Sequence, residues 1–303
     1  MAEEGTLPLN SGYAFTGVSN IHNDIYSAID ASTNPSLSQP GKIVLITGAG
    51  RGIGRAIALQ YAHASVAGII LSSRTTSELD EVEAAIQIIN PSVQVLKIKL
   101  DVTSESGVQN AYEAVRSLFG RLDVLVNNAG ASTAWTPIIT SNPTDWWRTF
   151  EINIKGPYLL LQAFLPLLLE TAEKHTTVVD VVNVSSIGAN IMTPDSSQYN
   201  VSKQALSRLT EYVDQEYAER GVVATSLHPG GVWTKLSRQE EERLTPYMTD
   251  TVELAGGFTV WLTAGARTYL GGRYVSANWD VEALEKLKDE IVQGDKLKQR
   301  LLI

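Results

Sequence analysis

Short apolar runs alternate along this chain with longer amphipathic segments, and this alternation limits the fold more than any other feature of the sequence. Six short runs have the composition of buried strands, at 43–47, 68–73, 93–100, 124–127, 178–184 and 222–227. Six longer segments have apolar residues at helical spacing, at 54–64, 77–89, 104–119, 146–170, 199–220 and 251–262. Continuously apolar strands separated by helices are typical of a parallel sheet covered on both faces. We therefore predict an α/β fold with a doubly wound parallel sheet.

The boundaries of this pattern divide the chain into three parts. Residues 1–40 are rich in Asn, Ser, Thr, Gly and Pro and are predicted to form an N-terminal extension. Residues 41–280 hold the whole pattern without an obvious linker, so we expect a single domain there. Residues 281–303 are charged and are predicted to form a helical tail. The extension could pack over the sheet, pack over a partner subunit or be mobile, and the sequence leaves these alternatives open.

Composition and charge exclude several classes of function. A formal net charge of -9 opposes nonspecific attraction to nucleic acid or anionic lipid. The chain has no cysteine, which rules out disulfides, thiolate metal sites and cysteine nucleophiles, and its four histidines lack the spacing of metal ligands. The longest apolar run, 158–169, is too short to span a bilayer, and the N-terminus does not resemble a signal peptide. We expect a cytoplasmic protein without a metal, membrane or nucleic-acid partner.

A glycine-rich turn lies directly between the first predicted strand and the first predicted helix. Its sequence is Thr47-Gly48-Ala49-Gly50-Arg51-Gly52-Ile53-Gly54. Glycines let the backbone approach a pyrophosphate closely, and the N-terminus of the following helix offers unpaired N–H groups to the anion. The turn therefore favours a Rossmann-type dinucleotide-binding domain. Its glycine spacing differs from the usual G-x-G-x-x-G, and a tight turn without a ligand is the alternative.

The end of the second predicted strand indicates which dinucleotide is bound. An acidic residue at this position would hold the ribose 2′-hydroxyl of NAD. Here the chain reads Ser72-Ser73-Arg74-Thr75, with no acid before Glu78. Arg74 could pair with a 2′-phosphate through its planar set of donors, and Arg51 in the glycine turn could contact the same phosphate. This pattern predicts NADP(H), unless both arginines are surface charges without a partner.

Three residues in the second half of the chain have the chemistry of a proton-transfer site. Tyr199 and Lys203 are four residues apart in a predicted helix and therefore share a face. A tyrosine with the reference pKa of about 10 is a poor proton shuttle at neutral pH, and a nearby ammonium that stabilises the phenolate would correct this. Ser186 ends the fifth predicted strand and could donate a hydrogen bond to a substrate oxygen. Taken alone, such a pair is more often a partly buried aromatic beside a solvated amine.

Further motifs follow the glycine turn in order along the chain. They are Asp101-Val102, Asn127-Asn128-Ala129-Gly130, Asn153, Ser186, Tyr199-Asn200-Val201-Ser202-Lys203 and Pro229-Gly230-Gly231-Val232-Trp233-Thr234. Together with the turn they resemble the classical short-chain dehydrogenase/reductase (SDR) family over about residues 41–278. The resemblance implies an NADP(H)-dependent oxidoreductase that interconverts a secondary alcohol and a ketone, or a primary alcohol and an aldehyde. Two features depart from the family: the long N-terminal extension, and the segment Val275-Ser276-Ala277-Asn278-Trp279, where the family often has two glycines.

The resemblance also implies a role for each candidate residue. Tyr199 would be the general acid/base, and Lys203 would lower its pKa and bind the nicotinamide ribose. Ser186 would orient the substrate oxygen, and Asn153 would anchor a water in the proton relay. Ser186 is preferred to Ser185 because it precedes Tyr199 by 13 residues, as in the family, which leaves Ser185 a structural role. The expected cofactor-binding residues are Gly48, Arg51, Gly52, Ile53, Gly54, Ser73, Arg74, Asp101, Val102, Asn128, Ala129, Gly130, Tyr199, Lys203, Pro229, Gly230, Val232 and Thr234.

Some of these residues also have simpler structural explanations. Asp101 could cap the helix that begins after Thr103, and Asn127 and Asn128 could be turn residues at the end of a strand. Asn153 is harder to explain in this way, because asparagine is unfavourable inside a helix unless its amide is used.

The substrate, the assembly and the reaction type are less constrained. The family places a mobile segment over the substrate at 233–249, and its apolar residues could form an apolar pocket or belong to the core. The residues concerned are Trp233, Leu236, Leu244, Pro246, Tyr247 and Met248, with Trp135, Trp146 and Trp147. By the resemblance, the helices at 146–170 and 199–220 would build a homodimer or homotetramer. Two other functions stay open: non-redox chemistry on the same fold, and a non-enzymatic NADP(H)-binding regulator.

Overall fold

The computed structural model describes residues 12–301, and its centre is a seven-stranded parallel sheet. The strands are β1 Ile43–Thr47, β2 Gly68–Ser73, β3 Gln94–Lys99, β4 Val124–Asn127, β5 Val179–Val184, β6 Val222–His228 and β7 Arg273–Ser276. They are arranged in the order β3-β2-β1-β4-β5-β6-β7. The predicted α/β, Rossmann-type doubly wound sheet is confirmed. The prediction did not include β7, which has only four residues.

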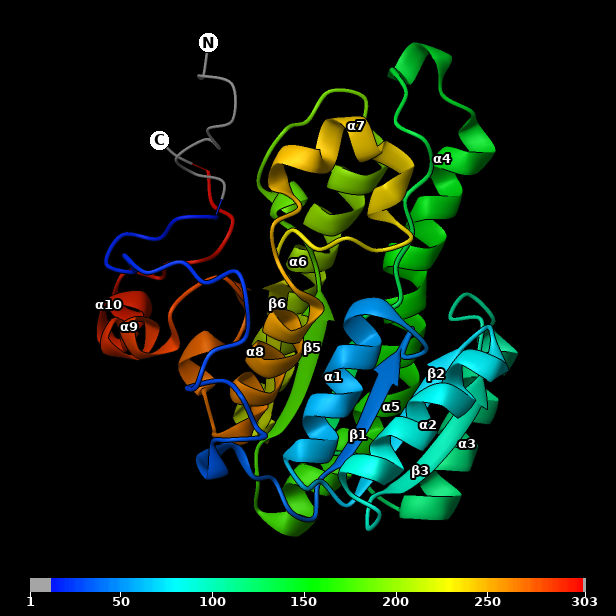
Figure 1. Ribbon diagram of the computed structural model, residues 1–303, viewed down its shortest axis with the longest axis vertical. Helices are drawn as coiled ribbons and strands as arrows, with labels where there is room; N and C mark the ends of the chain where they lie inside the picture. The colour runs from blue at the N-terminus through cyan, green and yellow to red at the C-terminus, as the bar shows by residue number, and fades with distance from the viewer. Residues whose placement is uncertain (1–11, 302–303) are drawn as a thin grey trace.

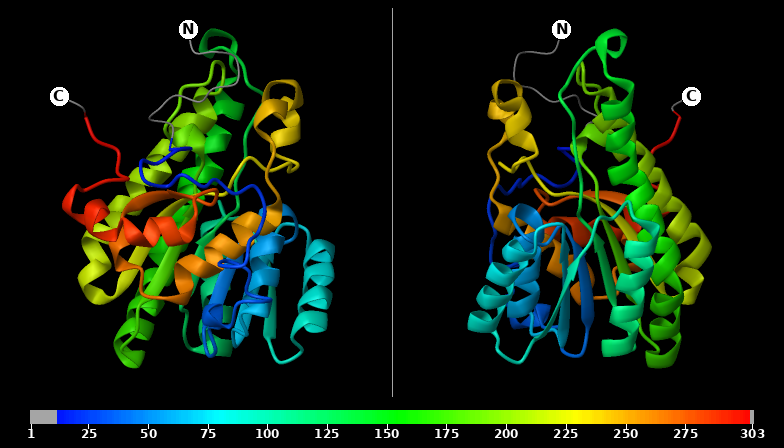
Figure 2. Two further views of the ribbon diagram at one scale, coloured as in Figure 1. Left: turned by 60° about the vertical axis from the view of Figure 1, so that its left-hand side comes forward. Right: turned by 90° about the vertical axis from the view of Figure 1, so that its right-hand side faces the viewer.

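Helices cover both faces of this sheet (Figure 2). One layer contains α1 Gly52–His63, α2 Thr76–Ile89 and α8 Val252–Ala264, and the other contains α3 Glu105–Phe119, α5 Gly156–His175 and α6 Ser197–Tyr217. Shorter helices lie outside these layers: α4 Pro143–Phe150, α7 Glu241–Leu244, α9 Val281–Lys286 and α10 Lys288–Gln293. Within the first layer, α1 and α8 lie side by side (Figure 1).

The packing of β1 shows why the strand is apolar from Ile43 to Ile46. All five of its residues are buried. Val44 and Ile46 belong to the core under α1 and α8, whereas Ile43 and Leu45 belong to the core under α3 and α5. Because successive side chains of a strand point to opposite faces, both sets must be apolar.

The helix predicted at 146–170 is interrupted in the structure. It consists of α4, a π-helical segment Glu151–Lys155 and α5. The whole stretch Pro143–His175 is long and apolar enough to cross a membrane, but half of its most apolar window is buried inside the protein. The buried side chains include Phe164 and Leu167, which pack against the sheet. The stretch is therefore buried in the way that is typical of a helix in the core of a folded protein.

The described part of the N-terminal extension packs against the folded domain beside α8, α9 and the chain after β7 (Figure 1). Val18 and Ile29 are buried. The ring of Phe15 lies 5.4 Å from that of Trp279, and Ile21 forms an antiparallel bridge to the same tryptophan. Trp279 is fully buried by these contacts. In residues 12–40, therefore, the extension is part of the packed structure of its own chain.

Candidate active site

A cavity of about 1160 Å³ opens at the carboxyl ends of the strands. In a doubly wound sheet this edge is where ligands bind, at the reversal of strand order between β1 and β4. Every residue predicted to bind the cofactor lines this one cavity, from Gly48 after β1 to Thr234 after β6. Ser186 lines it as well, whereas Asn153 does not. The cavity is the candidate active site.

The turn after β1 depends on its glycines. Gly48 and Gly52 have φ values of +65° and +54°, which residues with a Cβ rarely adopt. A Cβ on Gly54 would lie 2.3 Å from the carbonyl oxygen of Gly48. Asn128 holds the same turn from the end of β4, because its Nδ2 donates to the carbonyl oxygens of Thr47 at 2.8 Å and Gly48 at 3.2 Å. Asn128 is therefore not simply a turn residue at the end of β4, because its amide also holds the glycine turn in place.

The two predicted phosphate-binding arginines lie beside this turn. Arg51 is the N-cap residue of α1, and Gly52 to Gly54, which open the helix, line the cavity. Arg74 is exposed at the end of β2. Nη1 of Arg51 donates to Oε1 of Glu78 at 2.6 Å. The sequence suggested that Arg51 either contacts a phosphate or has no partner, and it did not predict this ion pair. Arg51 and Glu78 are 27 residues apart and meet only in the folded chain.

Asp101 and Val102 follow the end of β3 and line the cavity. Oδ1 of Asp101 accepts hydrogen bonds from the backbone N–H of Thr103 at 3.0 Å and from its hydroxyl at 2.7 Å. The N-cap of α3 is Ser104, whose side chain accepts from the N–H of Gly107. The suggestion that Asp101 caps this helix was therefore wrong.

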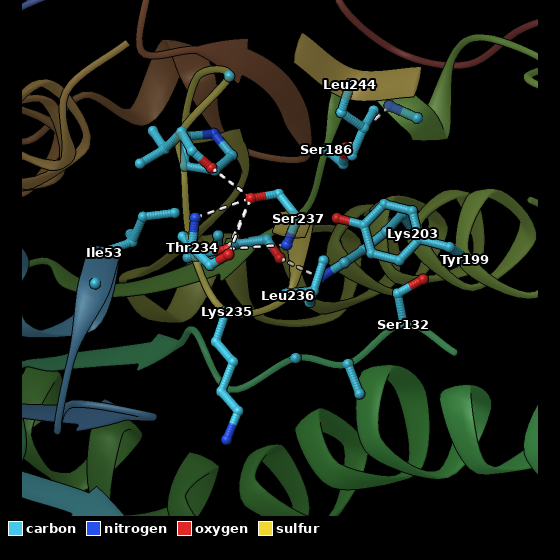
Figure 3. A pocket seen from close by; sticks show the side chains of 18 of the residues that line it. Ile53, Ser132, Ser186, Tyr199, Lys203, Thr234, Lys235, Leu236, Ser237 and Leu244 are labelled. Atoms are coloured by element: carbon cyan, nitrogen blue, oxygen red, sulfur yellow. Dashed lines mark hydrogen bonds between the residues drawn. The ribbon is translucent and has the colours of Figure 1, made fainter. Parts of the chain in front are cut away.

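Ser186 and Tyr199 come together on one wall of the cavity, opposite Ile53 (Figure 3). Ser186 follows β5 directly, and Tyr199 lies in the first turn of α6. Burial raises the pKa of the Tyr199 hydroxyl, and the neighbouring hydroxyl of Ser186 lowers it in part. The phenol is therefore protonated at neutral pH.

Lys203 lies one turn further along α6, with its Nζ 5.7 Å from the centroid of the Tyr199 ring. Only 4% of its surface is exposed. Nζ donates to the carbonyl oxygen of Val184 at 2.8 Å. Burial lowers the pKa of this amine to about 8, so it is still mostly charged at neutral pH. An ammonium with a single short protein contact thus lies behind the tyrosine.

Asn153 and Ser185 hold the wall together from behind. Oδ1 of Asn153 accepts from the N–H of Ala131 at 2.8 Å, and its Nδ2 donates to the carbonyl oxygen of Ala131 at 2.9 Å and to Oγ of Ser202 at 3.0 Å. The amide is therefore used, as its position in a helix suggested. Ser185 is buried and its hydroxyl donates to the carbonyl oxygen of Lys203.

The segment after β6 forms the opposite wall. Ser237 organises it, since Oγ accepts from the N–H of Thr234 at 2.8 Å and donates to the carbonyl oxygen of Val232 at 3.0 Å (Figure 3). The apolar residues predicted at 233–249 line the cavity, as does Trp135. Trp146 and Trp147 do not line it. They stack with Phe150 on α4, where Trp147 is 59% exposed, so the expectation for these two was wrong.

Three residues that matter for the geometry of the site were not predicted. The hydroxyl of Thr47 accepts from the N–H groups of Asn128 and Ala129, both at 3.0 Å. Asp250 lines the cavity and binds the N–H of Gly231. Tyr13 reaches the cavity from the N-terminal extension. Thr47 could have been predicted, because it begins the glycine motif. No sequence pattern pointed to Asp250 or Tyr13.

Comparison with known proteins gives a consistent result. The family described as short chain dehydrogenase matches residues 42–245. A short chain dehydrogenase of Monascus purpureus, mpl6, is 43% identical over 292 residues, covering 95% of this chain and 97% of that protein. A second, pigC of Monascus ruber, is 40% identical over 292 residues, covering 94% and 93%.

The fold is also found among solved structures. A 3-ketoacyl-(acyl-carrier-protein) reductase from Brucella melitensis, solved in complex with NADH, superposes with a TM-score of 0.69 at 25% identity. The match covers 79% of this chain and 97% of that one. The matching family region and the two Monascus relatives indicate the same family. The chain belongs to the short-chain dehydrogenase family of oxidoreductases.

Proposed function

We propose that this protein is an NADP(H)-dependent oxidoreductase that interconverts a secondary alcohol and a ketone, or a primary alcohol and an aldehyde, on a fairly hydrophobic small molecule. The observation that carries the proposal is that Ser186 and Tyr199, backed by the buried Lys203, line the same cavity as the glycine turn. These are the groups that carbonyl reduction needs: a proton donor, a donor for the substrate oxygen and a charge to stabilise the phenolate.

The cavity fits a bound dinucleotide. The turn is so tight that a Cβ on Gly54 would meet the carbonyl oxygen of Gly48 at 2.3 Å, and the N-terminus of α1 is available to a pyrophosphate. We assign Asp101 and Val102 to the adenine and the residues from Asn128 to Gly130 to the ribose side. The carboxamide of the nicotinamide is assigned to the segment Pro229, Gly230, Val232 and Thr234.

Arg74 and Arg51, with Ser73, are assigned to the 2′-phosphate that distinguishes NADP from NAD. Both arginines line the cavity. The Arg51–Glu78 pair does not prevent this, because ion pairs between exposed groups contribute only about 0–1 kcal/mol. A phosphate, which carries more charge than a carboxylate, can replace Glu78 as the partner of Arg51.

When bound, the nicotinamide supplies or accepts the hydride. The protein supplies the proton. In the reductive direction the hydroxyl of Tyr199 donates its proton to the substrate oxygen, while the hydroxyl of Ser186 donates a hydrogen bond to the same atom. The ammonium of Lys203 then stabilises the phenolate. Because burial raises the pKa of Tyr199, the free site starts with the phenol protonated, which suits reduction.

Asn153 is assigned to the proton relay as a positioning residue. All the hydrogen-bonding groups of its amide are engaged by Ala131 and Ser202. Ser202 directly precedes Lys203 on α6, and Ala131 follows the ribose-side residues, so the amide fixes the two walls relative to each other. Gly130 lies beside both residues, since a Cβ there would be 3.4 Å from Oδ1 of Asn153 and 3.5 Å from Nζ of Lys203.

The substrate end of the cavity supports a fairly hydrophobic ligand. Its wall includes Trp135, Trp233, Leu236, Leu244 and Tyr247. Large apolar groups with few polar ones are typical of small-molecule sites. The substrate class we propose is therefore a carbonyl compound, or the matching alcohol, with a mainly apolar body.

We also propose that the protein is cytoplasmic and assembles as a homodimer or homotetramer. Apolar side chains on α5 and α6 are exposed in the single chain, among them Tyr158 (49%), Val201 (46%) and Tyr212 (55%). These side chains would be buried if α5 and α6 packed against a second copy of the chain. Sedimentation of the purified protein, with Tyr212→Glu as the disrupting variant, tests this; a wild-type monomer would contradict it.

Non-redox chemistry and a purely regulatory role are the competing functions. Neither requires Ser186, Tyr199 and Lys203 together, and their assembly therefore favours the oxidoreductase. The test is a screen of ketones, aldehydes and alcohols that follows NADPH absorbance. Tyr199→Phe should lower turnover by about a thousandfold, within the range for loss of a general acid, and leave NADPH affinity nearly unchanged.

The matched control is Tyr217→Phe, which makes the same substitution at the far end of α6, outside the cavity. It should behave as wild type. Tight NADPH binding without turnover of any carbonyl compound would contradict the proposal and favour the regulator or the non-redox enzyme.

A further inference from the structure

Asp250 joins three distant parts of the chain at the cavity wall. Its carboxylate accepts hydrogen bonds from Nδ2 of Asn23 at 2.5 Å, from the N–H of Gly231 at 2.6 Å and from Nδ2 of Asn278 at 2.9 Å. Asn23 belongs to the N-terminal extension, Gly231 follows β6 and Asn278 follows β7. A carboxylate with three such donors is strongly fixed. We call Asn23, Gly231, Asp250 and Asn278 the Asp250 clamp.

The clamp fits closely against the main chain that carries the nicotinamide-side residues. Gly230 has a φ of +96°, and a Cβ there would lie 2.7 Å from Oδ2 of Asp250. The N–H of Asp250 in turn donates to the carbonyl oxygen of Gly231 at 2.9 Å. The two ends of the segment 231–250 are thereby tied together, and Val232 and Thr234 follow the tie directly.

The N-terminal extension makes further contacts at the same end of the segment. Nδ2 of Asn23 also donates to Oγ1 of Thr249 at 3.1 Å, and its carbonyl oxygen accepts from the N–H of Thr251 at 2.9 Å. The hydroxyl of Thr251 donates to Asp24 at 2.6 Å. Nearer the N-terminus of the extension, Tyr13 lines the cavity. The extension therefore reaches the cavity through Tyr13, and through Asn23 and Asp24 it contacts the end of the segment that forms the cavity wall.

We propose that the N-terminal extension is a positioning element of the active site: through Asn23 it holds Asp250, and through Asp250 it fixes the main chain that presents Val232 and Thr234 to the nicotinamide. The inference rests on the proposed function, because that function assigns this end of the cavity to the nicotinamide. Asn23 and Asp250 are positioning residues, which act through the segment they hold.

The physical basis is preorganisation. A segment that is already fixed loses little conformational freedom when a ligand binds, whereas a loose one must be ordered at the expense of affinity. The clamp acts at one end of the cavity only. Loosening it should therefore weaken ligands that reach the nicotinamide end and leave unchanged those confined to the adenosine end, where Arg74 lies.

The experiment compares two probes on the full-length protein. NADPH spans the cavity, and adenosine 2′,5′-bisphosphate occupies only the adenosine end. Asp250→Asn and Asn23→Ala are expected to weaken NADPH by about tenfold and a few fold, respectively, as befits hydrogen bonds to a charged group. The affinity for the bisphosphate should stay at the wild-type value in both variants.

A matched control separates positioning from general loosening of the extension. Asn34→Ala removes an asparagine that caps the short helix at 35–37 in the same extension, away from the cavity. It should lower the thermal midpoint of unfolding without changing the affinity for either probe. The exchange Asn23→Asp with Asp250→Asn swaps donor and acceptor and is expected to recover part of the NADPH affinity that Asp250→Asn loses.

The remaining outcomes overturn the inference. If Asp250→Asn and Asn23→Ala weaken both probes equally, the clamp only stabilises the fold. If they weaken neither, the extension does not act on the site. A wild-type protein that binds neither probe would instead reject the proposed function, and the inference with it.

Discussion

Nη1 of Arg51 lies 2.6 Å from Oε1 of Glu78, directly beside the glycine turn, so that an acid occupies the partner position assigned to a 2′-phosphate. The side chains are 52% and 28% exposed, which means that the pair is accessible to a competing anion. If Arg51 binds the 2′-phosphate as proposed, Glu78 competes with the nucleotide for it. Glu78 should reduce the affinity for NADP(H) without touching the nucleotide's reactive end.

Glu78→Gln should accordingly tighten NADPH about threefold, because Arg51 no longer has to leave a charged partner. NADH affinity should not change. Fluorescence titration of both nucleotides measures this, with Glu81→Gln, an exposed acid on the same helix, as the control. A weaker affinity for NADPH in Glu78→Gln would mean that Glu78 orients Arg51 toward the phosphate.

Arg74→Asp tests the assignment of the cofactor more directly. The substitution replaces a donor set that matches a phosphate by a carboxylate that repels it and can accept from a ribose 2′-hydroxyl. We expect NADPH to bind at least about tenfold more weakly and NADH to bind as well as before or better. Equal weakening of both nucleotides would remove Arg74 from the 2′-phosphate site.

Gly54→Ala tests the close approach in the turn. The new methyl would meet the carbonyl oxygen of Gly48 at 2.3 Å, and because both partners are backbone, neither can rotate away. Overpacking of this kind costs about 1–3 kcal/mol, and we expect nucleotide binding to be lost in addition. Equilibrium unfolding and nucleotide titration measure the two effects. An alanine variant with wild-type stability and affinity would show that the turn is not held as described.

The pH dependence of reduction should report on Lys203. Burial lowers the pKa of this amine to about 8, whereas burial raises that of Tyr199. As the pH rises through about 8, the ammonium is lost first, and turnover in the reductive direction should fall. In Lys203→Arg the charge persists, so the fall should move to higher pH in whatever activity remains. An unshifted profile would assign it to another group.

His228 should make the protein less stable in acid. Burial lowers its pKa to about 4, with Asp250 opposing the shift, and its Nδ1 accepts from the N–H of Ile187 at 3.1 Å. Between about pH 6.5 and 4 the unfolded chain takes up a proton that the folded chain does not, so the free energy of unfolding falls as the pH falls through this range. The loss should reach about 3 kcal/mol.

Unfolding by denaturant at several pH values measures this loss. His228→Asn keeps an acceptor for Ile187 and cannot be protonated, so its free energy of unfolding should depend less on pH in the same range. If wild type and variant lose stability in parallel, other groups are responsible.

The sequence predicted what depends on local chemistry. The glycine turn has to follow a strand and precede a helix, so Gly48 and Gly54 could be placed before any contact was known, and Tyr199 and Lys203 share a face by helical spacing alone. The preference for Ser186 over Ser185 came not from residue chemistry alone but from the spacing in the family resemblance, and Ser185 is buried with its hydroxyl donating to the carbonyl oxygen of Lys203.

The predictions that failed concern contacts across the fold. Trp147 is a large aromatic residue of the kind that lines apolar pockets, but on α4 it stacks with Phe150 outside the cavity and is 59% exposed. No local pattern in the sequence distinguishes this position from one that faces the cavity. Asp250 is an ordinary loop acid in the sequence. Its role arises only because Asn23 and Asn278, some 250 residues apart in the chain, lie on either side of it.

The packing of residues 13–23 on Trp279 and Asp280 also has a consequence for biosynthesis. The two sides of this contact are separated by 258 positions in the pair of His22 and Asp280, and by 266 in that of Tyr13 and Trp279. During synthesis this segment is made long before its partner, so Phe15 and Ile21 stay without their contacts to Trp279 until that residue has been made. A nascent chain that stops short of Trp279 keeps these apolar side chains exposed, which marks it for chaperones and proteases.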